Sequence, residues 1–156
     1  MPSVLIPCRQ IFRLDSNDLA DNIVGKIHGT DFILLVARER GVPVTIDGSS
    51  CVPPLPNEYD VKEQIREITE SGGEAVDVAI KLCLYCMKTQ VFLDGNKRAA
   101  VIFANHYLIA HGGGFLVIPE KEVPEFKRLL VGYYEGDDIS TIADFMKSNC
   151  WKTIQN

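Results

Sequence analysis

The stretch that decides the fold of this chain is Gln90-Val91-Phe92-Leu93-Asp94-Gly95-Asn96-Lys97-Arg98. It lies between two apolar segments with helical spacing, and the second of these runs from about Asn96 to Ala110. The stretch therefore falls at the start of a helix, where unpaired backbone N–H groups and the positive end of the helix dipole attract anions. The sequence predicts a phosphate site at this helix start.

The side chains of the stretch support this prediction. Gly95 permits a close approach of the backbone, and Lys97 and Arg98 add two cations, of which the Arg fork suits a pair of phosphate oxygens. Asp94 has the opposite charge, so a phosphate would be repelled unless a hard cation bridged the two groups. Asp94 is thus either a Mg²⁺ ligand or a simple helix N-cap, and spacing alone leaves both interpretations open.

The nine residues resemble the signature of the Fic/Doc (Fido) family, His-x-Phe-x-Asp-Gly-Asn-(Gly or Lys)-Arg. Phe92 and the run from Asp94 to Arg98 match it, whereas Gln90 stands where the family has its histidine. The resemblance implies a catalytic set, a nucleotide-binding set and one metal ligand. The catalytic residues are Gln90 (at the His position), Asn96 and Arg98. The nucleotide-binding residues are Gly95, Asn96, Lys97 and Arg98, and the metal ligand is Asp94.

The family's chemistry is the transfer of a nucleotidyl (AMP-type) or phosphoryl group to a Ser, Thr or Tyr hydroxyl of a target protein. The resemblance therefore implies ATP, or another nucleoside triphosphate, and Mg²⁺ as cofactors. In the family the histidine takes the hydroxyl proton, and the amide of Gln90 has no basic lone pair for this. General-base help contributes roughly 10²–10⁴-fold in rate, so a weak enzyme is expected. The alternative is a catalytically silent nucleotide- and peptide-binding module that acts as a regulator.

Lys97 bears on the type of reaction. Adenylyltransferases of the family commonly have Gly at this position, while the Doc kinase has Lys, so both activities stay open for an active protein. No inhibitory Ser/Thr-x-x-x-Glu-Gly/Asn motif is present in the sequence. Either a separate antitoxin restrains the protein, as in toxin–antitoxin pairs, or Gln90 has made restraint unnecessary.

The remaining pattern predicts a mainly helical, all-α protein with a single domain over 1–156, in which helices pack around the signature and the helix after it. Two helices are expected before Gly41, and a short extended run over Phe115 to Pro119. The other expected helices are Glu58 to Glu70, Val76 to Met87, Asn96 to Ala110, Lys121 to Tyr134 and Ile139 to Asn149.

Between the early helices and Glu58 the pattern changes to alternation. Val42, Val44 and Ile46 alternate with other residues, and Asp47-Gly48 is a strong tight-turn signal, so the segment predicts a β-hairpin. The pattern alone leaves open a plain solvent-facing connection. The resemblance identifies the segment, about 42–54, as the family's flap, which holds the target polypeptide by strand addition.

Composition sets limits on the class of protein. The chain has 156 residues, 46% of them hydrophobic, which suits one domain with a proper core. A formal net charge of −5 argues against a nucleic-acid partner. No apolar run is long enough to cross a membrane, so a cytoplasmic protein is expected. Members of the family often form dimers, so a homodimer is one possible partner arrangement, which the sequence does not decide. Cys83-x-x-Cys86 could be half of a zinc site, but core packing is the favoured interpretation.

Overall fold

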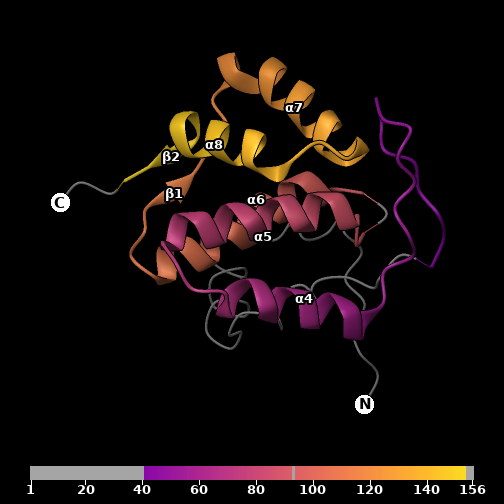
Figure 1. The fold of residues 1–156 in the computed structure, drawn as a ribbon, viewed down its shortest axis with the longest axis horizontal. Helices are drawn as coiled ribbons and strands as arrows, with labels where there is room; N and C mark the ends of the chain where they lie inside the picture. Colours follow the sequence, from indigo (N-terminus) through magenta and orange to yellow (C-terminus); the bar gives the residue numbers. More distant parts are fainter. Residues whose placement is uncertain (1–40, 93, 154–156) are drawn as a thin grey trace, which may run out of the picture.

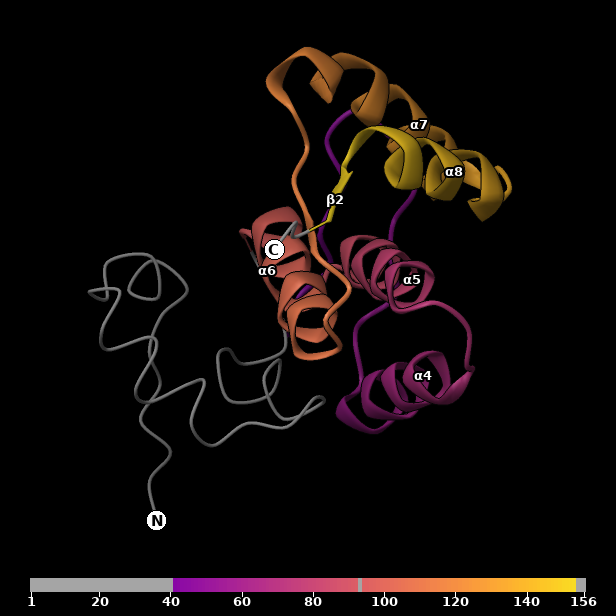
Figure 2. The same ribbon diagram turned by 90° about the vertical axis from the view of Figure 1, so that its left-hand side faces the viewer.

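The computed structural model describes residues 41–92 and 94–153, which form three tiers of helices (Figure 1). Helix α4 (Glu58–Glu70) is one outer tier, and α5 (Ala75–Thr89) and α6 (Asn96–Ala110) are the middle tier. Helices α7 (Val123–Glu135) and α8 (Ile139–Asn149) form the tier on the other side, after the 3-10 turn η2 (Glu120–Glu122). Figure 2 shows α5 and α6 side by side between these tiers. The described part is mainly helical, as predicted.

The middle tier contains most of the core. Helix α5 packs most extensively against α6, and it is apolar on nearly every side because α4, α6 and α8 all contact it. Its Leu82, Cys83 and Met87 are fully buried. Helix α5 ends just before Gln90, and α6 begins at Asn96. The signature therefore lies where α5 is connected to α6, the helix that packs most extensively against it.

The expected helices are confirmed, with bounds that differ by only one or two residues, within the usual uncertainty of helix ends. Local capping explains where two of them begin. The Asn57 side chain accepts a hydrogen bond from Tyr59 N at 2.9 Å at the start of α4, and Asp138 accepts one from Ser140 N at 2.6 Å at the start of α8. The two helices predicted before Gly41 lie outside the described residues.

The far end of α6 is fixed by a short sheet. Strand β1 (Phe115–Leu116) pairs antiparallel with β2 (Trp151–Lys152), which the sequence did not predict. Gly114 enters this sheet with φ +92°, and a Cβ there would lie 2.1 Å from Lys152 O, so the position requires glycine. The side chain of Asn105 on α6 bonds both Leu116 N, at 2.6 Å, and Leu116 O, at 2.8 Å. Helix α6 is therefore anchored directly to β1.

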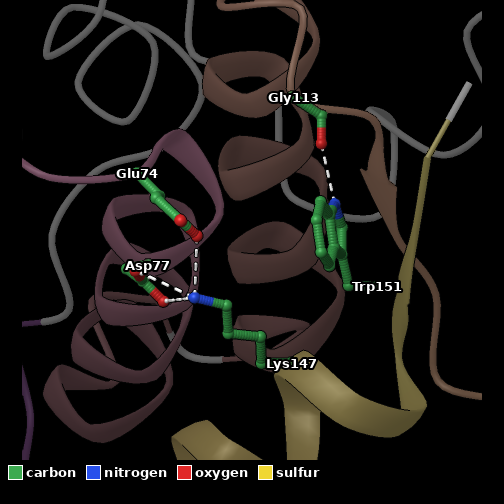
Figure 3. Close-up of polar contacts among 5 residues, drawn as sticks. All are labelled: Glu74, Asp77, Gly113, Lys147 and Trp151. Carbon is green, nitrogen blue, oxygen red and sulfur yellow. Dashed lines mark hydrogen bonds and ion pairs between the residues drawn. The ribbon is translucent and has the colours of Figure 1, made fainter.

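Two further contacts fix the C-terminal helix and strand against the middle tier (Figure 3). Lys147 Nζ on α8 lies 2.8 Å from both Glu74 Oε2 and Asp77 Oδ1 at the start of α5. The hydrogen bond to Asp77, with help from Glu74, raises the pKa of Lys147 to about 12. Trp151 Nε1 donates to Gly113 O at 2.7 Å, which joins the last strand to the turn after α6.

The predicted hairpin over 42–54 is wrong in one respect. The turn at Asp47-Gly48 exists, and Ser49 N donates to Ile46 O across it at 3.1 Å, but the described residues of this segment form no strand ladder. Pro43, together with the pair after Val52, removes backbone donors that a ladder would need. Instead the Ile46 side chain, 4% exposed, anchors the segment in the core.

The cysteines behave as the core interpretation predicts. Cys83, Cys86 and Cys150 are buried free thiols, and burial raises the pKa of Cys86 to about 12. Over 41–92 and 94–153 there is no group of three or more metal-ligating side chains that could hold a zinc ion. None of the described helices has both the length and the apolar character needed to cross a membrane.

Candidate functional site

A pocket of about 410 Å³ lies at the junction of α5 and α6. Two stretches of chain that are far apart in sequence line it. One is the turn Thr45 to Asp47, and the other is Gln90 with Asp94 to Arg98. The structure thus brings every predicted site residue to one pocket. Its volume lies within the range of small-molecule sites.

Asn96 fixes the shape of the loop that leads into α6. Its side chain is only 6% exposed, and it bonds the backbone of Phe92 twice: Phe92 N donates to Oδ1 at 2.8 Å, and Nδ2 donates to Phe92 O at 2.7 Å. Nδ2 also donates to Gln90 Oε1 at 3.1 Å. Buried polar groups must be paired, so this amide satisfies a backbone that would otherwise be orphaned. In this structure Asn96 holds the loop in place.

Gln90 ends α5 in a left-handed conformation, with φ 50° and ψ 55°. Among the described residues it is the one non-glycine residue with positive φ. Its side-chain Nε2 donates to Met87 O at 2.6 Å, and its Oε1 accepts the bond from Asn96. The amide therefore links the end of α5 to the start of α6, and both of its polar atoms are used within the protein.

The first turn of α6, Asn96 to Arg98, lines the pocket. Gly95 is the N-cap, with φ 79°, and it supplies no side-chain cap, while the first turn contains no acidic residue. The helical ladder begins with Ala99 N donating to Gly95 O at 2.9 Å. The exposed side chains of Lys97 and Arg98 lie in this first turn. A helix start without cap or acidic residue, but with two cations, suits an anion.

Asp94 lies in the loop just before the helix, with an exposed side chain. Its Oδ1 accepts a hydrogen bond from Gly95 N at 2.7 Å. The N-cap interpretation of Asp94 is wrong, because Gly95 occupies that position. The role of Asp94 as a Mg²⁺ ligand stays a prediction. It fits the ordinary pattern in which Mg²⁺ binds through one or two carboxylates and the phosphates of a substrate.

The turn Thr45 to Asp47 is the part of the pocket that sequence reasoning missed. The Asp47-Gly48 signal identified the turn, but the predicted hairpin drew attention to peptide docking. The turn is tied to the end of α7 by one carboxylate. Glu135 Oε1 accepts from Ser50 N at 3.0 Å and from the hydroxyls of Ser49 and Ser50, both at 3.2 Å. These bonds, together with buried Ile46, keep the turn beside the pocket.

We expect Glu135→Gln to weaken this tie in a pH-dependent way. The backbone N–H of Ser50, followed by the Ser50 and Ser49 hydroxyls, holds the pKa of Glu135 below its usual range. A lowered pKa gives stability that is present above the ordinary value, about 4.3, and is lost as pH falls through the folded value. The melting-temperature difference between the unmutated protein and Glu135→Gln should therefore disappear in acid. Thermal melts between pH 7 and pH 3 measure it.

Glu125→Gln is the matched control for this experiment. Glu125 lies on the same helix, and its hydrogen bond with Arg128 likewise holds its pKa below the usual range, but it contacts no part of the turn. Both variants should lose their acid-sensitive stability. Only Glu135→Gln should also change ligand binding in the pocket. Equal binding by both variants would contradict a role of Glu135 in holding the turn.

Comparison with known proteins adds no relative to this picture. The Fic/Doc resemblance rests on the signature residues, of which Gln90 and Asp94 to Arg98 line one pocket. No protein-family model matches the chain, and a search of curated proteins finds no match.

Proposed function

We propose that this chain is a Fic-type protein that binds a nucleoside triphosphate with Mg²⁺ at the start of α6. The proposed reaction is the transfer of a nucleotidyl or phosphoryl group to a hydroxyl of a target protein. In this proposal the target polypeptide approaches along the 42–54 segment, because the turn within that segment forms one wall of the pocket.

One observation carries the proposal: the start of α6, without a side-chain cap, lies in a pocket that also contains Lys97, Arg98 and Asp94. Backbone N–H groups and two cations would hold the phosphates. Asn96 already ties Phe92, before the loop, to the first turn of α6 without a ligand. Phosphoryl and nucleotidyl transfer depend mainly on positioning and charge neutralisation, which this arrangement supplies.

Asp94 is the residue that would hold Mg²⁺. Its carboxylate is exposed and lies next to the phosphate-binding turn, so it suits a hard cation shared with phosphate oxygens. When bound, Mg²⁺ would neutralise charge on the phosphates.

The hydrogen bonds of the Gln90 side chain favour a second function. Both polar atoms of its amide are engaged, with Met87 O and with Asn96, so the side chain is a structural link at the family's histidine position. A protein with this link and the same phosphate site would bind a nucleotide and a polypeptide without turnover. It would then act as a regulator.

We expect Gln90→His to increase the labelling of this protein's own hydroxyls by ATP with Mg²⁺. Histidine is among the residues that tolerate the left-handed conformation of position 90, so the fold should accept it. The gain should be about 100-fold or more, the usual contribution of a general base, where no other group of the pocket accepts the proton, and smaller where one does. The measurement uses ATP labelled at the α- or the γ-phosphate in parallel.

The two labels distinguish the reactions. Label retained from the α-phosphate alone shows nucleotidyl transfer, and label from the γ-phosphate alone shows phosphoryl transfer. Gln90→Ala, which lacks both the base and the link, is the control for nonspecific effects of changing this position. Absence of label in the unmutated protein and in Gln90→His, with ATP still bound, would leave the silent binding module as the function.

A further inference from the structure

The pocket at the start of α6 contains a second carboxylate, Asp47, which the signature does not include. Asp47 is exposed, and it shares the pocket with Gln90 and with the first turn of α6. We propose that Asp47 accepts the proton of the target hydroxyl during transfer, the task for which Gln90 has no suitable atom. This inference rests on the proposed transfer function and names a catalytic residue for it.

The groups that would otherwise take this role are accounted for. The amide of Gln90 is not a base, and its two polar atoms bond Met87 O and Asn96. Of the histidines in the described part, His106 and His111, neither lines the pocket. His111 caps the opposite end of α6 and its Nδ1 contacts Tyr107 O at 2.8 Å. Of the pocket's other groups in that part, Lys97 and Arg98 are assigned to the phosphates, which leaves the carboxylates of Asp47 and Asp94 as proton acceptors.

The two carboxylates of the pocket have different surroundings. Asp94 is part of the loop before α6, bonds Gly95 N, and lies next to the phosphate-binding first turn. Asp47 belongs to a separate segment of the chain, of which Thr45, Ile46 and Asp47 line the pocket. Environment commonly gives two carboxylates of one site different tasks. Asp94 is placed to share a cation with the phosphates, and Asp47 is placed where an acceptor polypeptide arrives.

The turn that carries Asp47 is held on both sides. Before it, Ile46 is buried with 4% exposure, and after it Ser49 N donates back to Ile46 O at 3.1 Å. Beyond the turn, Glu135 bonds Ser49 and Ser50. A proton acceptor must be held close to the proton it removes, and these contacts provide that fixation. Protein kinases likewise use an aspartate to accept the proton of the substrate hydroxyl.

In the proposed step Asp47 takes up the proton that the acceptor hydroxyl releases. The hydroxyl oxygen of the acceptor forms a bond to phosphorus, and its proton passes to an Asp47 carboxylate oxygen. The bond from that phosphorus to its bridging oxygen breaks, and pyrophosphate leaves in nucleotidyl transfer, or ADP in phosphoryl transfer. Asp47 then releases the proton to water, which restores the carboxylate.

Asp47→Asn tests the proposal directly. Asn-Gly forms tight turns as well as Asp-Gly, so this variant keeps the turn and removes only the proton acceptor. We expect the autolabelling rate at saturating ATP to fall about 100-fold or more. The ATP concentration that gives half the maximal rate, and the melting temperature, should not change. Asp144→Asn, an exposed aspartate on α8 outside the pocket, is the matched control and should label at the unmutated rate.

Two further measurements separate proton acceptance from other roles. If Asp47 were a metal ligand, Asp47→Asn would need more Mg²⁺ and excess Mg²⁺ would restore its rate, which would overturn the proposal. In the Gln90→His background a histidine supplies the base. There Asp47→Asn should lower the rate far less than in the unmutated background, a non-additivity expected of two groups with one task.

The outcomes also separate this inference from the proposed function. If ATP with Mg²⁺ fails to raise the melting temperature, the nucleotide site itself is absent and both proposals fail. If ATP binds but the unmutated protein shows no labelling, Asp47 accepts no proton and this inference alone fails. An unchanged labelling rate in Asp47→Asn overturns it equally.

Discussion

Arg98→Ala should abolish the rise in melting temperature that ATP with Mg²⁺ gives the unmutated protein. Arg98 lies in the first turn of α6, exposed and at the edge of the pocket. Its guanidinium can hold two phosphate oxygens at once, which Lys97 cannot replace with a single ammonium group. We therefore expect Arg98 to contribute more to phosphate binding than any other side chain of the pocket.

The size of the effect follows from linkage. A ligand present at a hundredfold excess over its Kd stabilises the folded state by about 2.7 kcal/mol, which corresponds to a shift of several degrees in a protein of this size. A hundredfold loss of affinity in Arg98→Ala would bring the same ligand concentration down to Kd. The stabilisation would then be about 0.4 kcal/mol, close to the limit of detection.

Arg128→Ala is the matched control for this change. Arg128 is an exposed arginine on α7 that pairs with Glu125 and does not line the pocket. Its removal takes away the same charge and should leave the ATP shift intact. A full shift in Arg98→Ala would show that the phosphates bind elsewhere, and an equal loss in both variants would show only nonspecific attraction of an anion.

Asn96→Ala should destabilise the fold by about 3 kcal/mol. The Asn96 side chain satisfies both the N–H and the C=O of Phe92, a buried residue, so alanine would leave two buried backbone groups unpaired. Each such group costs about 1–3 kcal/mol. For a chain of this length, about 3 kcal/mol lowers the melting temperature by roughly 6–12 °C. Thermal or denaturant unfolding measures the change.

The same helix offers a close control. Asn105→Ala removes a side chain with the same bonding pattern, since Asn105 bonds both Leu116 N and Leu116 O. Both variants should lose stability, but only Asn96→Ala should also lose the ATP-dependent shift, because only Asn96 shapes the loop at the pocket. A loss of less than about 1 kcal/mol in Asn96→Ala would show that water replaces the amide and that the loop does not depend on it.

The helical part of the fold was predictable because its signals are local. Helix α6 could be placed to the residue from the Gly95-Asn96 start and the apolar run that follows. Strand β2 could not be predicted, because Trp151 and Lys152 form a strand only through pairing with β1, a contact distant in sequence. Of the alternating residues Val42, Val44 and Ile46, Ile46 alone is buried. The absence of strand pairing in this segment was decided by prolines and by tertiary anchoring, which the alternation does not reveal.

In the candidate site, too, local features were predictable from the sequence and contacts between distant segments were not. The signature indicated the candidate site residues, Gln90 and Asp94 to Arg98, and these line one pocket. The engagement of Gln90 and Asn96 with each other was not predictable, because it depends on the left-handed backbone at position 90. The presence of Asp47 required knowing how the turn lies against α6, and Glu135, which holds the turn, is 85 residues away from Ser50 in sequence.

The left-handed backbone at Gln90 has a consequence for the history of the gene. Glutamine and histidine codons differ only in their third nucleotide, so one nucleotide change would place a general base, the histidine imidazole, at position 90. The backbone there already has a left-handed conformation, which histidine adopts more readily than most residues. Under the proposed function, a lineage could therefore gain or lose the general base by a single substitution at this position.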